Sequence, residues 1–142
     1  MDNVPTKNTT ARSTRGTSPP VRSFHDLVVW QRGMDLAEEV YRTSAQMPPD
    51  ERFGLTSQMR RAATSVPANI AEGHARESRK DYLRFLVIAR GSLAELQTHI
   101  LLAERLGLMS GQRLIALVRE ESVILQALIR SLRPPRPAAG NS

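Results

Sequence analysis

The sequence predicts an all-α protein that folds as an antiparallel up-down-up-down four-helix bundle, with a proline kink in the second helix. Three observations support this fold. Apolar residues recur at steps of three and four along four segments, which is the spacing of one helix face. No segment shows the apolar–polar alternation of a strand. The segments between the helices are short, so neighbouring helices are expected to run antiparallel.

The composition limits the class of protein. A chain of 142 residues suffices for one domain with a substantial core. It has no cysteine, which excludes disulfides and thiolate metal sites. The first residues are polar and unlike a signal peptide, and no apolar run approaches the length of a membrane span. We therefore expect a soluble cytoplasmic protein with no membrane partner.

The net charge of +6 is unevenly distributed along the chain. Residues 1–23 are rich in Thr, Ser, Pro and Arg and carry +3, and the Pro/Ala-rich residues 133–142 carry +2. The bundle domain, residues 24–132, is left with +1. Both flanks have too few apolar residues to order themselves, so we expect a disordered basic arm and a disordered tail. The arm is either functional or an inert extension.

The first helix is predicted over residues 26–46, with Asp26 as its N-cap and Pro48-Pro49 ending it. Phe24 and Leu27 are expected to fold back over the end of the bundle. Five residues at helical spacing form the core face: Val29, Gly33, Leu36, Val40 and Tyr41.

The second helix is predicted to begin between Asp50 and Thr56 and to reach Glu72. Its apolar rhythm continues through Pro67, which indicates one kinked helix. Four residues are assigned to this kink and its end: Pro67, Asn69, Glu72 and Gly73.

Each of these residues has an expected role. Gly73 would stop the helix. Pro67 has no N–H, so the carbonyl of Ala63 loses its donor, and the Asn69 amide could donate to such a group. Glu72 would pair with a nearby arginine. The alternative is that Asn69 and Glu72 line a site at the end of the bundle.

The third and fourth helices are predicted over residues 78–106 and 110–132. Ser78 and Asp81 fit a capping box at the start of the third, and Gly107 follows its end. Ser110 is the expected N-cap of the fourth. Glu121 falls in the apolar rhythm of that helix, so it either turns to the rim or pairs with an arginine at an interface.

The third helix carries a second apolar stripe, about 100° around the helix from the first. It comprises Leu83, Val87, Ala94 and Leu101. One stripe suffices for a monomeric bundle, so the second predicts an interface for self-association. The alternative is a broad core face.

The second helix also carries a resemblance to a known family. The run Leu55-x-x-Gln58-x-x-Arg61-Ala62-Ala63-x-Ser65-Val66-Pro67-x-Asn69-Ile70-Ala71-Glu72-Gly73 is similar to the pattern of the four helix bundle protein family, whose founding members are encoded by intervening sequences in bacterial 23S rRNA genes. Further matches follow in Phe24-x-x-Leu27-x-x-Trp30-Gln31, Gly91-Ser92-Leu93-x-Glu95-Leu96-x-Thr98 and Leu106-Gly107. The resemblance spans residues 24–109, and more loosely reaches residue 132.

The resemblance implies a ring-like homo-oligomer, a pentamer. A related group resembles the accessory variability determinant proteins of diversity-generating retroelements, which assist a reverse transcriptase by binding RNA and the enzyme. The resemblance thus implies structured RNA, and a partner protein such as a reverse transcriptase, as partners.

No arrangement of residues indicates catalysis. The Glu-x-x-His motif of di-iron bundles is absent at His25, His74 and His99. Ser65 and His74 lack a third group that would orient the histidine. We therefore expect no enzymatic activity, no catalytic residue, no cofactor and no metal site.

The candidate binding signal is a cluster of bases between residues 60 and 90. This segment contains seven basic and three acidic residues. The seven basic residues are assigned to nucleic-acid binding: Arg60, Arg61, Arg76, Arg79, Lys80, Arg84 and Arg90. The guanidinium fork of arginine suits phosphate. Aromatic residues are few and most look like core, so we expect contact with the backbone of structured RNA or other nucleic acid rather than reading of bases.

Two functions follow from these patterns: a self-assembling scaffold that contacts nucleic acid, or a protein–protein adaptor on which the bases are only a solvated face.

Overall fold

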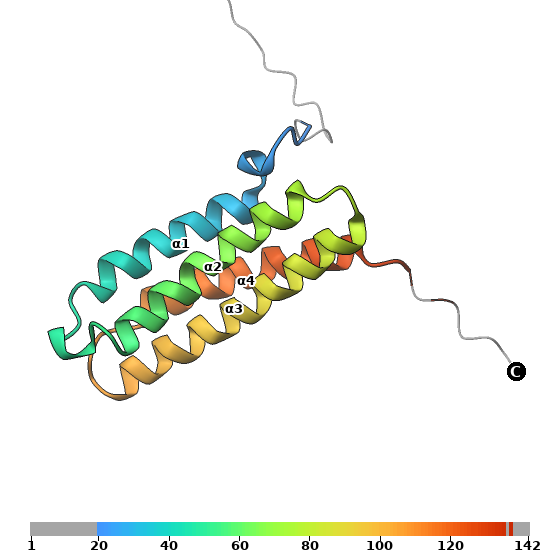
Figure 1. Cartoon of the computed structure of the whole chain (residues 1–142). Coiled ribbons are helices and arrows are strands. Elements are labelled where there is room, and N and C mark those ends of the chain that lie inside the picture. The colour runs from blue at the N-terminus through green and yellow to red at the C-terminus, as the bar shows by residue number, and fades with distance from the viewer. Residues whose placement is uncertain (1–19, 136, 138–142) are drawn as a thin grey trace, which may run out of the picture.

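The computed structural model describes residues 20–135 and 137, and shows four helices packed side by side and antiparallel (Figure 1). They are α1 (Val28–Ser44), α2 (Leu55–Ala75), α3 (Arg79–Arg105) and α4 (Gln112–Leu132). Two short 3-10 turns precede α1 and α2, namely η1 (Phe24–Asp26) and η2 (Pro49–Glu51). Each long helix packs against two neighbours, and α2 against α3 is the most extensive contact. The predicted all-α bundle is confirmed.

The core runs along the centre of the bundle and receives side chains from all four helices. Its largest fully buried apolar members are Leu36, Val40, Met59, Val66, Ile70, Leu86, Leu96, Ile100, Leu114, Leu125 and Ile129. They recur at the three- and four-residue steps that the sequence predicted. Tyr41 was expected in this set but is exposed.

The two ends of the bundle differ in what they carry. The α2–α3 hairpin lies at one end, together with the start of α1 and the end of α4 (Figure 1). The α1–α2 and α3–α4 connections lie at the other end. We call these the hairpin end and the loop end.

The two predicted caps at the start of α1 and α4 are wrong. Leu27 is the N-cap residue of α1, while the Asp26 carboxylate accepts the backbone N–H of Arg22 (3.0 Å) and Ser23. Asp26 therefore closes the preceding 3-10 turn instead. At α4 the N-cap residue is Gly111, not Ser110. By contrast, the Ser78 hydroxyl accepts the Asp81 N–H at 3.0 Å, as predicted for α3.

Gly73 does not stop α2, which continues to Ala75 without a break at Pro67. The glycine is needed for helix packing instead. A Cβ atom at this position would lie 2.7 Å from the Cβ of Phe85 and 3.1 Å from Tyr82 Cδ2. Gly73 therefore permits the close approach of α2 and α3. Gly107, with φ of 69°, is the glycine that follows a helix end as predicted.

The polar residues near Pro67 find local partners. The Asn69 amide donates to the Ser65 carbonyl (2.8 Å) and hydroxyl (2.9 Å), and not to Ala63 as expected. Glu72 pairs with Arg76 at 3.0 Å, so the predicted ion pair is confirmed.

Glu121 does not lie at the rim, and it forms no ion pair with any residue in the described part of the chain. Its side chain is fully buried, and neither carboxylate oxygen has a hydrogen-bond partner among the described residues. Burial raises the pKa of Glu121 from 4.5 to about 8, and repulsion from Glu120 adds to the shift. The carboxyl is therefore largely protonated at neutral pH.

By length and composition alone, α3 is long and apolar enough to cross a membrane. From the sequence we expected no apolar run that approaches this length. Core helices of bundles satisfy the same criterion, and α3 contributes Phe85, Leu86, Leu93 and Ile100 to the interior.

Candidate nucleic-acid interface

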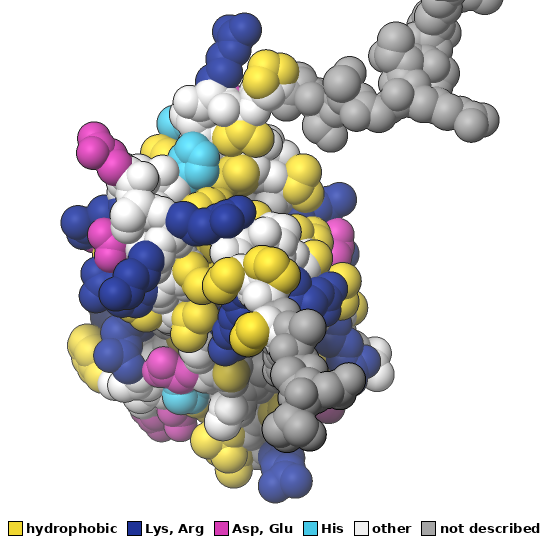
Figure 2. Space-filling view, turned by 90° about the vertical axis from the view of Figure 1, so that its right-hand side faces the viewer, with side chains coloured by type: hydrophobic (Ala, Val, Ile, Leu, Met, Phe, Trp, Pro, Cys, Tyr) yellow, Lys and Arg dark blue, Asp and Glu magenta, His cyan; other side chains and the backbone are white. Residues whose placement is uncertain are grey.

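Four of the predicted bases lie together at the hairpin end, where α2 ends and α3 begins. We call Arg76, Arg79, Lys80 and Arg84 the hairpin group. The capping bond of Ser78 fixes the first turn of α3 and so places Arg79 and Lys80 on a defined helix rather than on a loop. Figure 2 faces this end of the bundle and shows more Lys and Arg than Asp and Glu side chains.

Two members of the group flank one aromatic ring. The Arg76 guanidinium lies 5.1 Å, and that of Arg84 4.9 Å, from the ring centroid of Phe85. Arginine over an aromatic face keeps its N–H groups free at the edge, where a phosphate can accept them. Arg79, Lys80 and Arg84 form no ion pair with any residue in the described part of the chain. Their charge is therefore available to an anionic partner.

The hairpin group borders a groove with an apolar floor, of about 430 Å³. We call it the α3 groove, and it is lined by Lys80, Asp81, Leu83, Arg84, Val87, Ile88 and Arg133. Arg133 follows α4 and was not among the predicted site residues. It joins Lys80 and Arg84 because the C-terminal end of α4 lies at the hairpin end (Figure 1). Arg133 was missed in the sequence because it is far from Lys80 and Arg84 along the chain.

The other three predicted bases do not belong to this group. Arg60 and Arg61 lie near the start of α2, about 20 Å along the helix from Ala75. Arg90 is half-buried, three helical turns into α3. The single cluster of seven bases expected from the sequence is therefore divided along the length of the bundle.

Arg60 has a structural role in this fold. Its Nε donates to Ser44 Oγ at 2.9 Å and its Nη2 to the Tyr41 carbonyl at 3.3 Å. The guanidinium also lies 4.6 Å from the Tyr41 ring centroid. These contacts join the end of α1 to α2. Arg61 instead donates to Glu95 on α3 at 3.4 Å, and both side chains are largely exposed.

The second stripe of α3 is only partly covered by the chain itself. Leu83 and Val87 are half-buried, whereas Ala94 and Leu101 are exposed. Ile88 and Leu102, which the sequence reasoning did not include, are also exposed. The four predicted interface residues thus follow a partly exposed apolar face along α3. No partner chain is present, so self-association stays a prediction.

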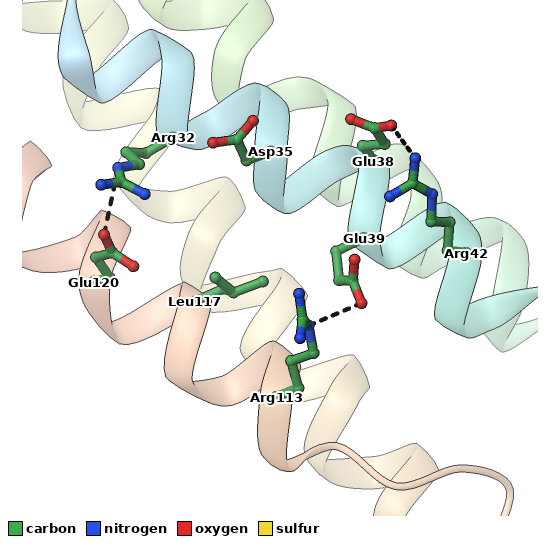
Figure 3. A pocket seen from close by; sticks show the side chains of 8 residues that line it. All are labelled: Arg32, Asp35, Glu38, Glu39, Arg42, Arg113, Leu117 and Glu120. Atoms are coloured by element: carbon green, nitrogen blue, oxygen red, sulfur yellow. Dashed lines mark hydrogen bonds and ion pairs between the residues drawn. The ribbon is translucent and has the colours of Figure 1, made fainter.

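Another face of the bundle carries a hollow of about 300 Å³ between α1 and α4 (Figure 3). Four acids and three arginines line it. Arg32–Glu120 (3.4 Å) and Arg113–Glu39 (3.0 Å) join the two helices, and Arg42 pairs with Glu38 along α1. The lining residues are Arg32, Asp35, Glu38, Glu39, Arg42, Arg113, Leu117 and Glu120. This face is mildly acidic, opposite in sign to the α3 groove.

The groups that could have suggested catalysis are placed apart. Ser65 Oγ lies 2.8 Å from Ser92 Oγ, while the His74 ring packs edge-on against Tyr82 at 5.6 Å. His99 shares a 3.4 Å contact with Glu95 one turn away on the same helix. Among residues 20–135 and 137, no three His, Cys, Asp or Glu side chains gather as a metal site would require.

Comparison with known protein families matches residues 25–130 to the family described as 23S rRNA-intervening sequence protein. The chain belongs to this family. The predicted resemblance is confirmed, and it covers the whole bundle.

A solved structure supports the same fold. It is a protein of unknown function from the S23 ribosomal protein family of Bacteroides thetaiotaomicron, with 22% sequence identity and a TM-score of 0.66. The match covers 72% of this chain and 96% of that one. No match was found among curated proteins.

The residues matched to the 23S rRNA-intervening sequence protein family include every predicted site residue. Arg133 lies just outside the matched residues, although it borders the α3 groove.

Proposed function

We propose that this protein is a non-enzymatic scaffold that assembles into a ring of copies, a pentamer, and contacts the phosphate backbone of structured RNA through the hairpin group. One observation carries the proposal. Arg79, Lys80 and Arg84 stand together on one end of a rigid hairpin without an ion pair to any described residue. Such bases attract phosphate, and phosphate contact supplies most non-specific nucleic-acid affinity. The family name refers to 23S rRNA, which makes RNA the first nucleic acid to test.

Self-assembly would strengthen this modest basic surface. A closed ring requires two different complementary surfaces on each copy. The exposed part of the α3 stripe, at Ala94 and Leu101, offers one such surface further along α3 than the hairpin group, and the α1–α4 face (Figure 3) offers a second. Repeating the hairpin group around a ring would raise avidity without any new contact.

RNA binding is tested with the full-length chain by fluorescence anisotropy on a labelled RNA duplex at several salt concentrations. The variant exchanges Arg79 and Lys80 for Glu. Acids are favourable in the first turn of a helix, so this variant should fold. The matched control exchanges the exposed Arg105 and Arg119 for Glu, which changes the net charge equally at a distance from the group.

The hairpin variant should lose most duplex affinity, and the slope of log affinity against log salt should become shallower by about 2. The control should lose much less. Equal losses would mean that only total charge matters, and the hairpin group would then not be a site.

Assembly is tested by light scattering during size-exclusion chromatography. Val87→Glu and Leu101→Glu place charges on the α3 stripe and should give a smaller species than the wild type. Val123→Glu, at an exposed apolar position on α4, is the control. A wild-type protein that is monomeric at high concentration contradicts the scaffold.

The adaptor function is the second candidate, and the partly exposed stripe of α3 favours it. On that function the stripe binds another protein, and the hairpin bases serve only solubility. Exchanging Arg79 and Lys80 for Glu would then leave partner binding intact, whereas Leu101→Glu would remove it.

A further inference from the structure

Phe53 is the most exposed large apolar side chain in the described part of the protein, at 88% of its full surface. It lies between η2 and α2, in the connection from α1, and therefore at the loop end. The sequence reasoning regarded aromatic residues as core and did not single it out. An isolated apolar residue on a surface is ordinary, but an aromatic ring held out on a loop provides a flat, exposed stacking surface.

A shallow hollow of about 410 Å³ lies beside this ring. Two aromatic residues, three arginines, one serine and one threonine surround it. The lining residues of this Phe53 hollow are Tyr41, Arg52, Phe53, Thr56, Ser57, Arg60 and Arg61. It combines stacking surfaces with phosphate-binding groups on neighbouring elements.

The side chains of the hollow are held to different degrees. Arg60 is fixed by its bonds to Ser44 and Tyr41, so it forms a rigid wall. Arg52 lies 5.3 Å from the Phe53 ring centroid. Arg61 makes exposed contacts with Gln58 and Glu95, and exposed pairs of this kind contribute little to stability. Arg52 and Arg61 can therefore turn towards a ligand.

We propose that the Phe53 hollow binds one unpaired nucleotide of RNA, with the base stacked on Phe53 and its phosphate contacted by Arg52 and Arg61. The inference rests on the proposed RNA-binding function and adds the class of nucleotide recognised. Unstacked bases of loops and single strands stack on aromatic side chains, and guanidinium groups bind their phosphates. A base inside a duplex is already stacked and cannot reach Phe53, so the hollow discriminates between paired and unpaired RNA.

The position of the hollow separates it from the hairpin group. The two lie at opposite ends of α2, whose 21 residues span about 30 Å. One structured RNA could thus place a helical stem at the hairpin end and unpaired nucleotides at the loop end.

The test compares two labelled RNAs, a blunt duplex and an unstructured single strand, on the full-length chain. Phe53→Ala should lower single-strand affinity on the order of 10-fold and leave duplex affinity unchanged. Phe53→Tyr, which keeps an aromatic ring, should retain single-strand binding. Val123→Ala removes a similarly exposed apolar side chain on α4 and should change neither affinity.

A direct reading comes from Phe53→Trp, because stacking on a base quenches indole fluorescence. The single native tryptophan, Trp30, lies near the start of α1, at the other end of the bundle. Single-stranded RNA should therefore quench the variant more than the wild type, and duplex RNA should quench both equally.

The outcomes separate this inference from the proposed function. If exchanging Arg79 and Lys80 for Glu abolishes duplex binding while Phe53→Ala changes no RNA affinity, the hollow is not a nucleotide site, although the scaffold function stands. If duplex RNA never binds but Phe53→Ala weakens single-strand binding, the hollow stands and the backbone-binding function fails. If Phe53→Ala alters only the oligomeric state, the Phe53 side chain is a contact between copies and the inference is wrong.

Discussion

Gly33 on α1 leaves the space that the Glu121 carboxylate on α4 occupies. A Cβ atom on Gly33 would lie 2.8 Å from Glu121 Oε2 and 3.5 Å from the Cβ of Pro67. The buried acid thus lies beside the contact between Gly33 on α1 and Pro67 on α2. Arg32, which partly offsets the raised pKa, and Asp35, which adds to it, are on the same helix as Gly33.

The first prediction concerns the pH dependence of stability. The folded state holds the Glu121 proton up to about pH 8, whereas the unfolded chain loses it near 4.5. Over that interval the folded state binds more protons, so the free energy of unfolding falls as pH rises, by roughly 5 kcal/mol in total, and levels off above pH 8. Urea denaturation of wild type and Glu121→Gln between pH 4.5 and 9 measures this.

The difference between the two unfolding free energies isolates the single carboxyl. Glu77→Gln, at an exposed acid, is the matched control for the loss of one carboxyl. Parallel curves for wild type and Glu121→Gln would mean that the buried carboxyl is ionised in the folded state.

The second prediction concerns two helical glycines. Gly73→Ala brings a Cβ to 2.7 Å from the Cβ of Phe85, so it should destabilise the bundle by about 1–3 kcal/mol. Gly91→Ala meets no atom within 4 Å and should stabilise by about 0.5–1 kcal/mol, because alanine favours the helix. Thermal unfolding of both variants decides this, and a shift in the same direction for both would show that α2 and α3 are less closely packed than described.

The third prediction compares two serines near helix starts. Ser78→Ala removes the bond from the Asp81 N–H and should cost about 1 kcal/mol. Ser110→Ala should change stability very little, because Gly111 holds the N-cap position of α4. Chemical denaturation distinguishes the two variants. A comparable loss of stability in Ser110→Ala would show that Ser110 caps α4, as the sequence indicated.

The fourth prediction separates structural from available arginines. Arg60→Ala loses two hydrogen bonds and an aromatic contact between α1 and α2, so it should cost about 1–2 kcal/mol. Arg79→Ala, which is exposed and has no ion pair among the described residues, should change stability by less than about 0.5 kcal/mol. Unfolding curves for both variants are the measurement, and equal costs would refute the structural role of Arg60.

The helices were predictable because period and capping are local properties. Ser78 and Gly107 act within one turn of a helix, so the chain around them contains the information. Gly73 was misassigned because its requirement comes from Phe85 on another helix. Glu121 was misassigned for a similar reason, since the space it fills is created by a glycine far along the chain.

The candidate site was predictable only in part. Arg79, Lys80 and Arg84 are close in sequence and therefore close in space. Arg60 is also nearby in sequence, but the length of α2 places it near the loop end. Arg133 and Phe53 depend on how the helices return, which no local pattern of charge or hydropathy describes.

An even number of antiparallel helices brings the chain back to the end where it started. The start of α1 and the end of α4 both lie at the hairpin end (Figure 1). A fluorescent protein or an affinity tag joined directly before η1 or directly after α4 would therefore be attached at the same end as Arg79 and Lys80, and far from Phe53. Immobilisation through such a tag would hinder one surface and present the other, so binding assays should use untagged protein or a label placed on the exposed side of α4.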